Sequence, residues 1–418
     1  MRVTLLILFT SLLAITVENS LAQEQKTRKT VLVIVDGIPA DLLERLPTPN
    51  IDAISREGGY TRAYTGGERG GYSETPTISA VGYNSMLTGT WSNKHNVWGN
   101  GIEDPNYHYW TIFRFLKESK PSAKLAIYST WLDNRTKLLG ADLPQTGNLT
   151  LDDHYDGYEL DTVRFPHDNN SRYINMIDEE VTKQASKGIR EDAPYLSWVY
   201  LQYTDDMGHR YGQSEEMIRA VKIADRQIGE IYNAIQYREQ YFNEDWLLVV
   251  TTDHGRNVVD GSGHGGQTDA ERGIWIATNC PSLNKHFFAH TPAIVDILPS
   301  VAEHMQITIN EKQRYELDGV SFIGEVSVAD PRAELVGDTL AVEWTPFANQ
   351  GSVKVLVTAT NQFNKQGLEH PDSYQTIGEY KISARKAKIK LPENLANSKF
   401  LKVIIEGEHN AVNRWIVK

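Results

Sequence analysis

The sequence predicts an α/β fold: a doubly wound, mostly parallel sheet flanked by helices, with a small β-sandwich near the C-terminal end. Two observations support this prediction. Over residues 29–325, short apolar runs alternate with helix-like segments, as in strands joined by crossover helices. Over residues 330–418, the segments are short and β-branched, and Asn, Gly, Pro and Asp separate them. We therefore expect two domains with these bounds.

The composition limits the class of protein and the chemistry of any site. The chain has 418 residues and a formal net charge of -12, which argues against a protein that coats nucleic acid. A small anionic substrate held by metal ions is not excluded. Cys280 is the single cysteine, so an intrachain disulfide and a multi-thiolate metal site are excluded. Any metal ion must bind mainly Asp, His and hydroxyl groups.

The N-terminal segment has the pattern of a signal peptide over residues 1–22. A basic Met1-Arg2 start precedes a mostly apolar run from Val3 to Val17, and Ser20-Leu21-Ala22 is a small-x-small cleavage site. The alternative is a membrane anchor, but the run is shorter than the roughly 20 residues that a spanning helix needs. No later segment is long and apolar enough to span a bilayer. We expect an exported protein, periplasmic or extracellular.

The α/β prediction depends on five apolar runs and one amphipathic segment. Thr30–Val35 is nearly continuous and β-branched, as expected of a parallel strand covered on both faces. Similar runs follow at Ala123–Tyr128, Leu196–Tyr203, Trp246–Thr252 and Gly273–Ala277. Ser214–Ile235 has apolar residues at helical spacing, and Ser214 is a candidate N-cap. This segment predicts a helix that packs on the sheet.

The C-terminal prediction depends on four segments that alternate or are β-branched: Thr339–Trp344, Val353–Thr358, Lys388–Leu391 and Phe400–Ile405. Short strands over about 90 residues predict a small β-sandwich. The first strands and Trp344 resemble a fibronectin type III module. This region has no candidate catalytic cluster, so we expect an appendage for packing or surface binding.

Acidic and histidine side chains follow three of the predicted strands. These candidate ligands are Asp36, Asp205, His209, Asp253, His254 and His264. Each alone has a simpler interpretation, because Asp is common in turns and caps and a lone His is more often a surface residue. Together they predict a site for two divalent cations at one edge of the sheet. Asp206 is an alternative to Asp205, although the spacing to His209 favours Asp205.

A nucleophile is expected in the hydroxyl-rich segment from Ser73 to Gly89, where a helix is predicted to begin at Ser79 or Ala80. Backbone N–H groups and the helix dipole favour a phosphoryl group at such a helix start. Chemistry alone leaves three candidates, which are Thr75, Thr77 and Ser79. Each could instead be an ordinary cap or turn hydroxyl.

These motifs resemble the alkaline phosphatase superfamily, and within it the type I phosphodiesterase/nucleotide pyrophosphatase branch. The resemblance covers about residues 29–323 and includes the candidate ligands in the order found in the family. The segments that carry it are Val35-Asp36-Gly37, Thr48-Pro49-Asn50-Ile51-Asp52, Ser85-Met86-Leu87-Thr88-Gly89, Asp205-x-x-x-His209, Asp253-His254-Gly255, Gly263-His264-Gly265 and Asp296-Ile297-Leu298-Pro299-Ser300.

The resemblance implies an alkaline-phosphatase-like domain over residues 29–325 with assigned site residues. One cation would be held by Asp205, His209 and His264, and the other by Asp36, Asp253, His254 and the nucleophile. The nucleophile position corresponds to Ser79, which departs from the threonine of the diesterase branch but keeps the hydroxyl. Asn100 corresponds to an asparagine that donates to a phosphoryl oxygen. Zinc suits this Asp/His set best, and manganese is the alternative.

The expected substrate is a small phosphate ester or nucleotide-like molecule, cut through a phosphoseryl intermediate on Ser79. A monoester would need additional basic residues, for which Arg69, Lys94 and Arg256 are candidates. A diester or pyrophosphate, which we favour, would need an apolar or aromatic cleft. Candidates for its lining are Tyr72, Tyr83, Trp91, Trp98 and Trp131.

Three other functions are alternatives to this hypothesis. A sulfatase would share the fold, but the chain lacks a Cys/Ser-x-Pro-x-Arg sequence for formylglycine formation. The predicted export signal argues against a relative of cofactor-independent phosphoglycerate mutase. A non-catalytic, metal-bearing protein that binds carbohydrate or a surface would require a lost ligand or nucleophile. The sequence leaves the oligomeric state open.

Overall fold

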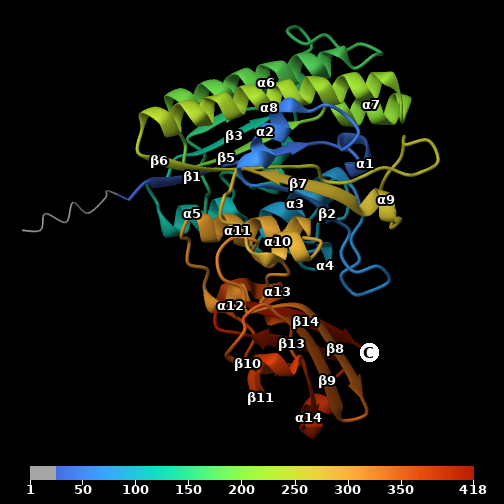
Figure 1. Cartoon of the computed structure of the whole chain (residues 1–418). Coiled ribbons are helices and arrows are strands. Elements are labelled where there is room, and N and C mark those ends of the chain that lie inside the picture. The colour runs from blue at the N-terminus through green and yellow to red at the C-terminus, as the bar shows by residue number, and fades with distance from the viewer. Residues whose placement is uncertain (1–24) are drawn as a thin grey trace, which may run out of the picture.

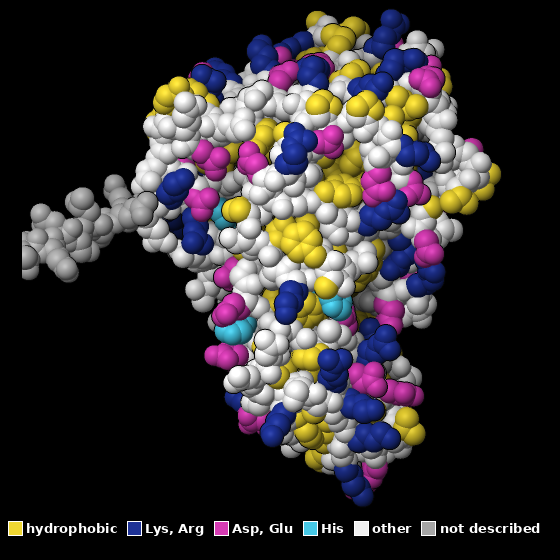
Figure 2. All heavy atoms as spheres, in the orientation of Figure 1, with side chains coloured by type: hydrophobic (Ala, Val, Ile, Leu, Met, Phe, Trp, Pro, Cys, Tyr) yellow, Lys and Arg dark blue, Asp and Glu magenta, His cyan; other side chains and the backbone are white. Residues whose placement is uncertain are grey.

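The computed structural model describes residues 25–418. The predicted signal peptide over residues 1–22 lies outside the described residues. Figure 1 shows an α/β body, with a central sheet between two helical layers, and a separate group of antiparallel strands formed by the C-terminal part. On the face shown in Figure 2, basic and acidic side chains are mixed over both parts.

The central sheet has seven strands, and its centre is parallel as predicted. β1 lies between β5 and β6, and both neighbours are parallel to it. In sheet order, the strands are β2 (Gly59–Tyr64), β7 (Gly273–Thr278), β6 (Glu244–Thr251), β1 (Thr27–Val35), β5 (Leu196–Leu201), β3 (Leu125–Ser129) and β4 (Asp153–Tyr155). The run expected at Gly273–Ala277 forms β7, which is antiparallel to β6 and to β2. The sequence prediction did not include β2 and β4.

The alternation of side chains along β1 explains why both faces of the sheet need a helical layer. Val31, Val33 and Val35 belong to one apolar core, and Leu32 and Ile34 belong to another. Residues of α2 (Pro49–Glu57), α6 (Arg172–Glu191) and α8 (Glu215–Tyr241) contribute to the first core. Residues of α3 (Ser79–Thr88), α5 (Ile112–Ser119) and α11 (Ile297–His304) contribute to the second.

The predicted helix at Ser214–Ile235 is α8, which continues to Tyr241. The Ser214 side chain accepts a hydrogen bond from the backbone N–H of Met217, as expected of an N-cap. Shorter helices connect the main elements: α1 (Ala40–Leu43), α4 (Ser92–His95), α9 (Asp269–Arg272), α10 (Lys285–Ala289) and α12 (Glu311–Arg314).

One strand prediction was too long. The run Leu196–Tyr203 forms a strand only as far as Leu201, and α7 (Tyr203–Tyr211) begins directly afterwards. The buried carboxyl of Asp178 accepts hydrogen bonds from the backbone N–H groups of Gln202 at 3.1 Å and Tyr203 at 2.8 Å. A carboxyl at this position satisfies N–H groups that a helix leaves free at its first turn.

The C-terminal part contains two antiparallel sheets, in agreement with the predicted β-sandwich. One sheet has the order β11 (Gln375–Lys381), β10 (Ser352–Thr358), β13 (Phe400–Glu406) and β14 (Ala411–Val417). The other has the order β12 (Lys386–Lys390), β9 (Thr339–Pro346) and β8 (Val328–Val336). Trp344 is buried in their common core, where its indole N–H donates to the Ile382 carbonyl at 2.8 Å. Two short helices, α13 (Gln362–Gln366) and α14 (Glu393–Ala396), complete this part.

Within residues 25–418, no helix combines the length and the apolar character needed to cross a membrane.

Candidate metal centre

The six predicted ligands form two groups at one edge of the central sheet. Because β6, β1 and β5 are neighbours, the segments that follow them lie side by side. Every residue of a group offers one candidate ligand atom, and the three atoms of that group lie within 4.8 Å of one another. The first group is Asp36, Asp253 and His254. The second group is Asp205, His209 and His264.

The first group is completely enclosed. All three side chains are buried, and His254 Nε2 lies 3.3 Å from Asp36 Oδ1 and 3.3 Å from Asp253 Oδ2. These two carboxylate oxygens have no hydrogen-bond partner among residues 25–418. Two buried carboxylates with unpartnered oxygens are costly without a compensating charge. The donor set therefore fits a cation, since it offers two oxygens and one nitrogen around a common point.

Surrounding hydrogen bonds orient these ligand atoms. His254 Nδ1 lies 2.9 Å from the carbonyl of Gly255, so Nδ1–H donates to it and Nε2 faces the two carboxylates. The Tyr200 hydroxyl donates to Asp36 Oδ2 at 2.7 Å, and the Tyr83 hydroxyl donates to the same atom. Burial opposes a positive charge on His254, but the adjacent Asp253 raises its pKa to about 9. The centre of the first group therefore stabilises positive charge.

The second group is more open. His209 is exposed, and Asp205 and His264 are partly buried. His209 Nε2 lies 3.3 Å from Asp205 Oδ2 and 3.0 Å from His264 Nε2. His264 Nδ1 lies 2.8 Å from the carbonyl of Thr77, which leaves Nε2 to face the other ligand atoms. Burial, followed by the charge of His254, lowers the pKa of His264 to about 4, so this ring is neutral near pH 7, as a ligand must be.

The two groups adjoin through stacked imidazoles. The rings of His254 and His264 have centroids 3.6 Å apart and planes inclined by 11°. The segment from Asp253 to His264 therefore contributes to both groups, as the sequence predicts.

Asp205 belongs to the second group, whereas Asp206 lies outside it. Both residues lie in the first turn of α7, where Gln202 Nε2 donates to Asp206 Oδ2 at 3.0 Å. Asp205 and His209 lie on a helix rather than in a loop at the strand end. Their four-residue spacing places them on one helical face.

The structure distinguishes among the three candidate hydroxyls. Ser79 Oγ lies 3.4 Å from His254 Nε2, at the first residue of α3. Thr75 Oγ1 donates to the Ser73 carbonyl at 2.9 Å, and Thr77 Oγ1 donates to the Gly266 carbonyl at 2.8 Å. Of the three, only Ser79 has its hydroxyl against a ligand of the first group.

Asn100 lies beside the N-terminus of α3, the helix that begins at Ser79. Its side chain is exposed, and Oδ1 accepts a hydrogen bond from the backbone N–H of Ala80 at 3.0 Å. The amide Nδ2 can therefore donate to a bound oxygen, because Oδ1 is already engaged.

Lys94 does not lie at the ligand groups. It is completely buried, and its Nζ donates to the Glu316 carbonyl at 2.7 Å, Asp318 Oδ1 at 2.6 Å and Asn413 Oδ1 at 2.9 Å. The hypothesis that Lys94 contacts a phosphate is therefore wrong. The physical reason is that three buried acceptors, one of them on β14, already occupy its ammonium group.

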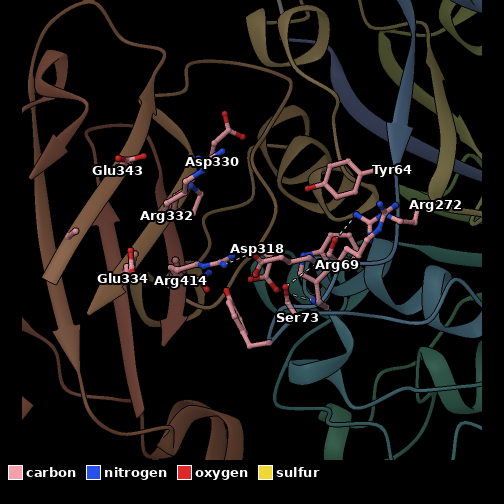
Figure 3. Close-up of a pocket in the computed structure, with 18 residues that line it drawn as sticks. Tyr64, Arg69, Ser73, Arg272, Asp318, Asp330, Arg332, Glu334, Glu343 and Arg414 are labelled. Carbon is pink, nitrogen blue, oxygen red and sulfur yellow. Dashed lines mark hydrogen bonds and ion pairs between the residues drawn. The ribbon is translucent and has the colours of Figure 1, made fainter. Parts of the chain in front are cut away.

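Several other residues proposed from the sequence to contact the substrate line a separate cavity. This cavity, of about 800 Å³, lies between β8, β9 and the segment from Tyr64 to Ser73 (Figure 3). Arg69, Tyr72 and Trp91 belong to its lining. Arg69 also forms an ion pair with the exposed Asp269 at 2.5 Å. None of the cavity-lining residues is a member of either ligand group.

The remaining candidates have different surroundings. Tyr83 is completely buried, with its hydroxyl on Asp36, so it does not line an open cleft. Trp131 is partly buried and Trp98 is 48% exposed. Arg256 does lie at the ligand groups, but its buried guanidinium is bonded to Asp205.

The sequence analysis did not identify Tyr200 as a site residue. Tyr200 lies opposite Ile34 in the register of β1 and β5, close to Asp36. No local signal marks this tyrosine, because its role depends on strand pairing.

Comparison with known families gives one match over most of the α/β part. Residues 30–275 match the family described as type I phosphodiesterase / nucleotide pyrophosphatase. Among curated proteins, the chain is 22% identical over 251 residues to ectonucleotide pyrophosphatase/phosphodiesterase family member 7 of Rattus norvegicus, covering 57% of this chain and 52% of that protein. It is 21% identical over 305 residues to bis(5'-adenosyl)-triphosphatase enpp4 of Xenopus laevis, covering 68% and 60%, respectively. The chain spans about half the length of the curated relatives it matches first.

Two solved structures support the fold. A putative sulfatase from Bacteroides thetaiotaomicron VPI-5482 matches with a TM-score of 0.53 and 11% identity, covering 84% of this chain and 86% of that one. Ps i-CgsB in complex with k-i-k-neocarrahexaose matches with a TM-score of 0.51 and 16% identity, covering 77% and 82%. At these identities, the similarity supports the fold alone.

Proposed function

Because this chain belongs to the type I phosphodiesterase/nucleotide pyrophosphatase family, we propose that it is a two-metal hydrolase of phosphate esters with Ser79 as its nucleophile. The observation that carries this proposal is the position of Ser79 Oγ, 3.4 Å from His254 Nε2. In this position the hydroxyl is next to the first group and at the N-terminus of α3. A nucleophile and an anion-binding helix end are thus combined at one point.

The two groups are proposed as the ligand sets of two divalent cations. The first cation would bind Asp36, Asp253, His254 and Ser79, and the second would bind Asp205, His209 and His264. When bound, such cations lower the pKa of a coordinated hydroxyl and stabilise the charge on a leaving oxygen. Zinc suits the mixed oxygen and nitrogen donors, and manganese is the alternative.

The protein's own residues define the reaction geometry. Ser79 releases its hydroxyl proton to solvent, and its Oγ bonds to phosphorus as the bond from phosphorus to the ester oxygen breaks. The ester oxygen leaves with its substituent, and a phosphoseryl intermediate remains. The Asn100 amide holds a phosphoryl oxygen beside the N-terminus of α3, where the helix dipole favours negative charge. Water then cleaves the serine–phosphate ester and restores the Ser79 hydroxyl. The leaving group departs past His209, on the exposed side of the site.

The proposed substrate is a small diester or pyrophosphate of nucleotide-like size. Arg69, Lys94 and Arg256, the basic candidates for the additional charge of a monoester, are bonded to other protein groups. One relative named above is a member of the ectonucleotide pyrophosphatase/phosphodiesterase family, and another is named a bis(5'-adenosyl)-triphosphatase. These names support the same substrate class.

We also propose that the protein is exported after removal of residues 1–22. The names of the ectonucleotide relatives support this location. The proposed domain bounds are residues 29–325 for the catalytic domain and 330–418 for the β-sandwich. The two apolar cores beside the central sheet contain no residue beyond Ile323, which supports this division. The core of the β-sandwich takes only Val320 from the catalytic part, and a small further cluster joins Tyr315 to the C-terminal strands.

The test compares turnover of bis-p-nitrophenyl phosphate, p-nitrophenyl phosphate and p-nitrophenyl sulfate by the wild type and by Ser79→Ala. We expect the diester to be the best substrate, and a loss of at least about 10³-fold in kcat in the variant. Ser85→Ala is the matched control, because this buried hydroxyl lies on the same helix but bonds to Val81 and His95. Equal turnover by wild type and Ser79→Ala would refute the nucleophile, and preferred sulfate hydrolysis would refute the substrate class.

A further inference from the structure

Arg256 connects three segments of the metal centre. Only 3% of the residue is exposed. Its Nε donates to the Gly37 carbonyl at 2.9 Å, in the turn after β1. Its Nη2 donates to the Asp205 carbonyl at 3.0 Å and to Asp205 Oδ1, both on α7. Its Nη1 donates to the Ser262 carbonyl at 3.3 Å, two residues before His264.

Two glycines provide the space for this guanidinium. A Cβ added to Gly208 would lie 2.1 Å from Arg256 Cζ, and a Cβ added to Gly37 would lie 2.6 Å from Nη2. Gly37 also has a φ of +66°, which other residues rarely adopt. An alanine at position 208 would therefore displace the guanidinium from Asp205, although alanine is the better helix former.

We infer that Arg256 is a positioning residue that holds Asp205 as a one-oxygen ligand and fixes the spacing of the two groups. The inference rests on the proposed function. Arg256 occupies Oδ1 of Asp205, so that Oδ2 faces His209 Nε2 at 3.3 Å. Through its bond to Gly37, Arg256 connects α7 to the residue that follows Asp36. Through its bond to Ser262, Arg256 connects α7 to the loop that contains His264.

This role differs from that of a phosphate ligand. All three nitrogens of the guanidinium already donate to protein acceptors, and the group is enclosed. Arginine has no acceptor and does not bind a cation, so it acts on the second group only through Asp205. Partners of this kind set the orientation of a ligand, and their loss typically costs 10–100-fold in metal affinity.

The test measures zinc binding in variants that isolate the second group. Asp253→Asn removes a ligand of the first group, and Arg256→Gln or Gly208→Ala is then added to it. We expect either addition to weaken zinc binding by about 10–100-fold. In the otherwise unchanged protein, the same two substitutions should leave the first cation bound. Arg69→Gln is the matched control, because Arg69 forms an ion pair with the exposed Asp269, and it should retain two cations.

Gly208→Ala keeps the arginine and tests its position, so it remains informative if Arg256→Gln does not fold. The inference would be overturned if the second group kept its wild-type zinc affinity in both variants. An increased KM for phosphate esters in those variants would then indicate a phosphate contact instead. A wild-type protein that binds no zinc or manganese would instead refute the proposed function, and with it this inference.

Discussion

The two ligand groups contain the same residue types, Asp and His, but they differ in whether protein groups already bond to their carboxylate oxygens. In the first group, Asp36 Oδ1 and Asp253 Oδ2 are buried and have no hydrogen-bond partner in the described chain. In the second group, Asp205 is already bonded to Arg256 and lies beside His209. The unpartnered oxygens of the first group are therefore available to a cation, whereas Asp205 in the second group already has a positively charged partner.

The pKa values of Asp253 and Asp205 show the same difference between the two groups. Burial raises the pKa of Asp253, and the adjacent Asp36 raises it further. Burial also acts on Asp205, but the hydrogen bond from His209 and the charge of Arg256 hold its pKa below the usual range. We therefore expect the first group to bind its cation more tightly and the second to exchange its cation more readily.

The largest effect is expected when the first group is broken. Asp253→Asn keeps the oxygen that accepts from Gly37 N–H at 3.2 Å, but it removes the charge and one ligand. Turnover of bis-p-nitrophenyl phosphate should fall by about 10⁴-fold or more, because Ser79 loses its activating cation. Elemental analysis should find one cation fewer per chain. Full turnover with both cations retained would contradict the importance of this group.

A smaller effect is expected for the second group. His209→Ala removes an exposed ligand and should reduce turnover by at least about 100-fold at low zinc concentration. Because the group is open to solvent, excess zinc should restore part of the activity, whereas it should not rescue Asp253→Asn. Zinc titration of both variants checks this difference. Equal rescue of the two variants would remove the distinction between the groups.

The tyrosine hydroxyls around Asp36 are specific to the first group. Tyr200→Phe removes the hydroxyl that donates to Asp36 Oδ2 at 2.7 Å. We expect a 10–100-fold loss in affinity for the first cation and little change for the second. Tyr128→Phe is the control, because within residues 25–418 its buried hydroxyl has no hydrogen-bond partner. A chelator titration of the wild type and both variants gives the affinities. Equal affinities in all three would show that the Tyr200 hydroxyl has no role.

The smallest effect concerns the helix that carries Asp205 and His209. Burial, opposed by the hydrogen bond from Thr130, raises the pKa of Asp178 to about 7. The folded pKa exceeds the ordinary value of 3.8, so this group's contribution to stability falls as pH rises from about 4 to about 7. Asp178→Asn removes that dependence. The Tm difference, wild type minus variant, should therefore be larger near about pH 5 than near about pH 8. A pH-independent difference would contradict the assignment.

The sequence predicts the first group better than its surroundings. Asp36 and Asp253 follow long apolar runs, and such runs mark buried parallel strands whose ends meet. The α/β class, the C-terminal β-sandwich and the family resemblance are all confirmed. The change from strand to helix at Tyr203 was missed because Asp178, which caps α7, lies on another helix. The positions of Lys94 and Arg256 depend on Asn413 and Asp205, which are distant in sequence, so their partners could not be predicted.

In the proposed reaction, Ser79 carries the phosphoryl group next to the two ligand groups. The most direct measurement is acid quenching of the wild type during turnover of a diester, followed by mass spectrometry of the peptide that contains Ser79. We predict the added mass of the substrate-derived phosphoryl group on Ser79, and its absence in Ser79→Ala. Modification of Thr75 or Thr77 instead, or turnover without a covalent phosphopeptide under conditions that trap the intermediate, would contradict the account.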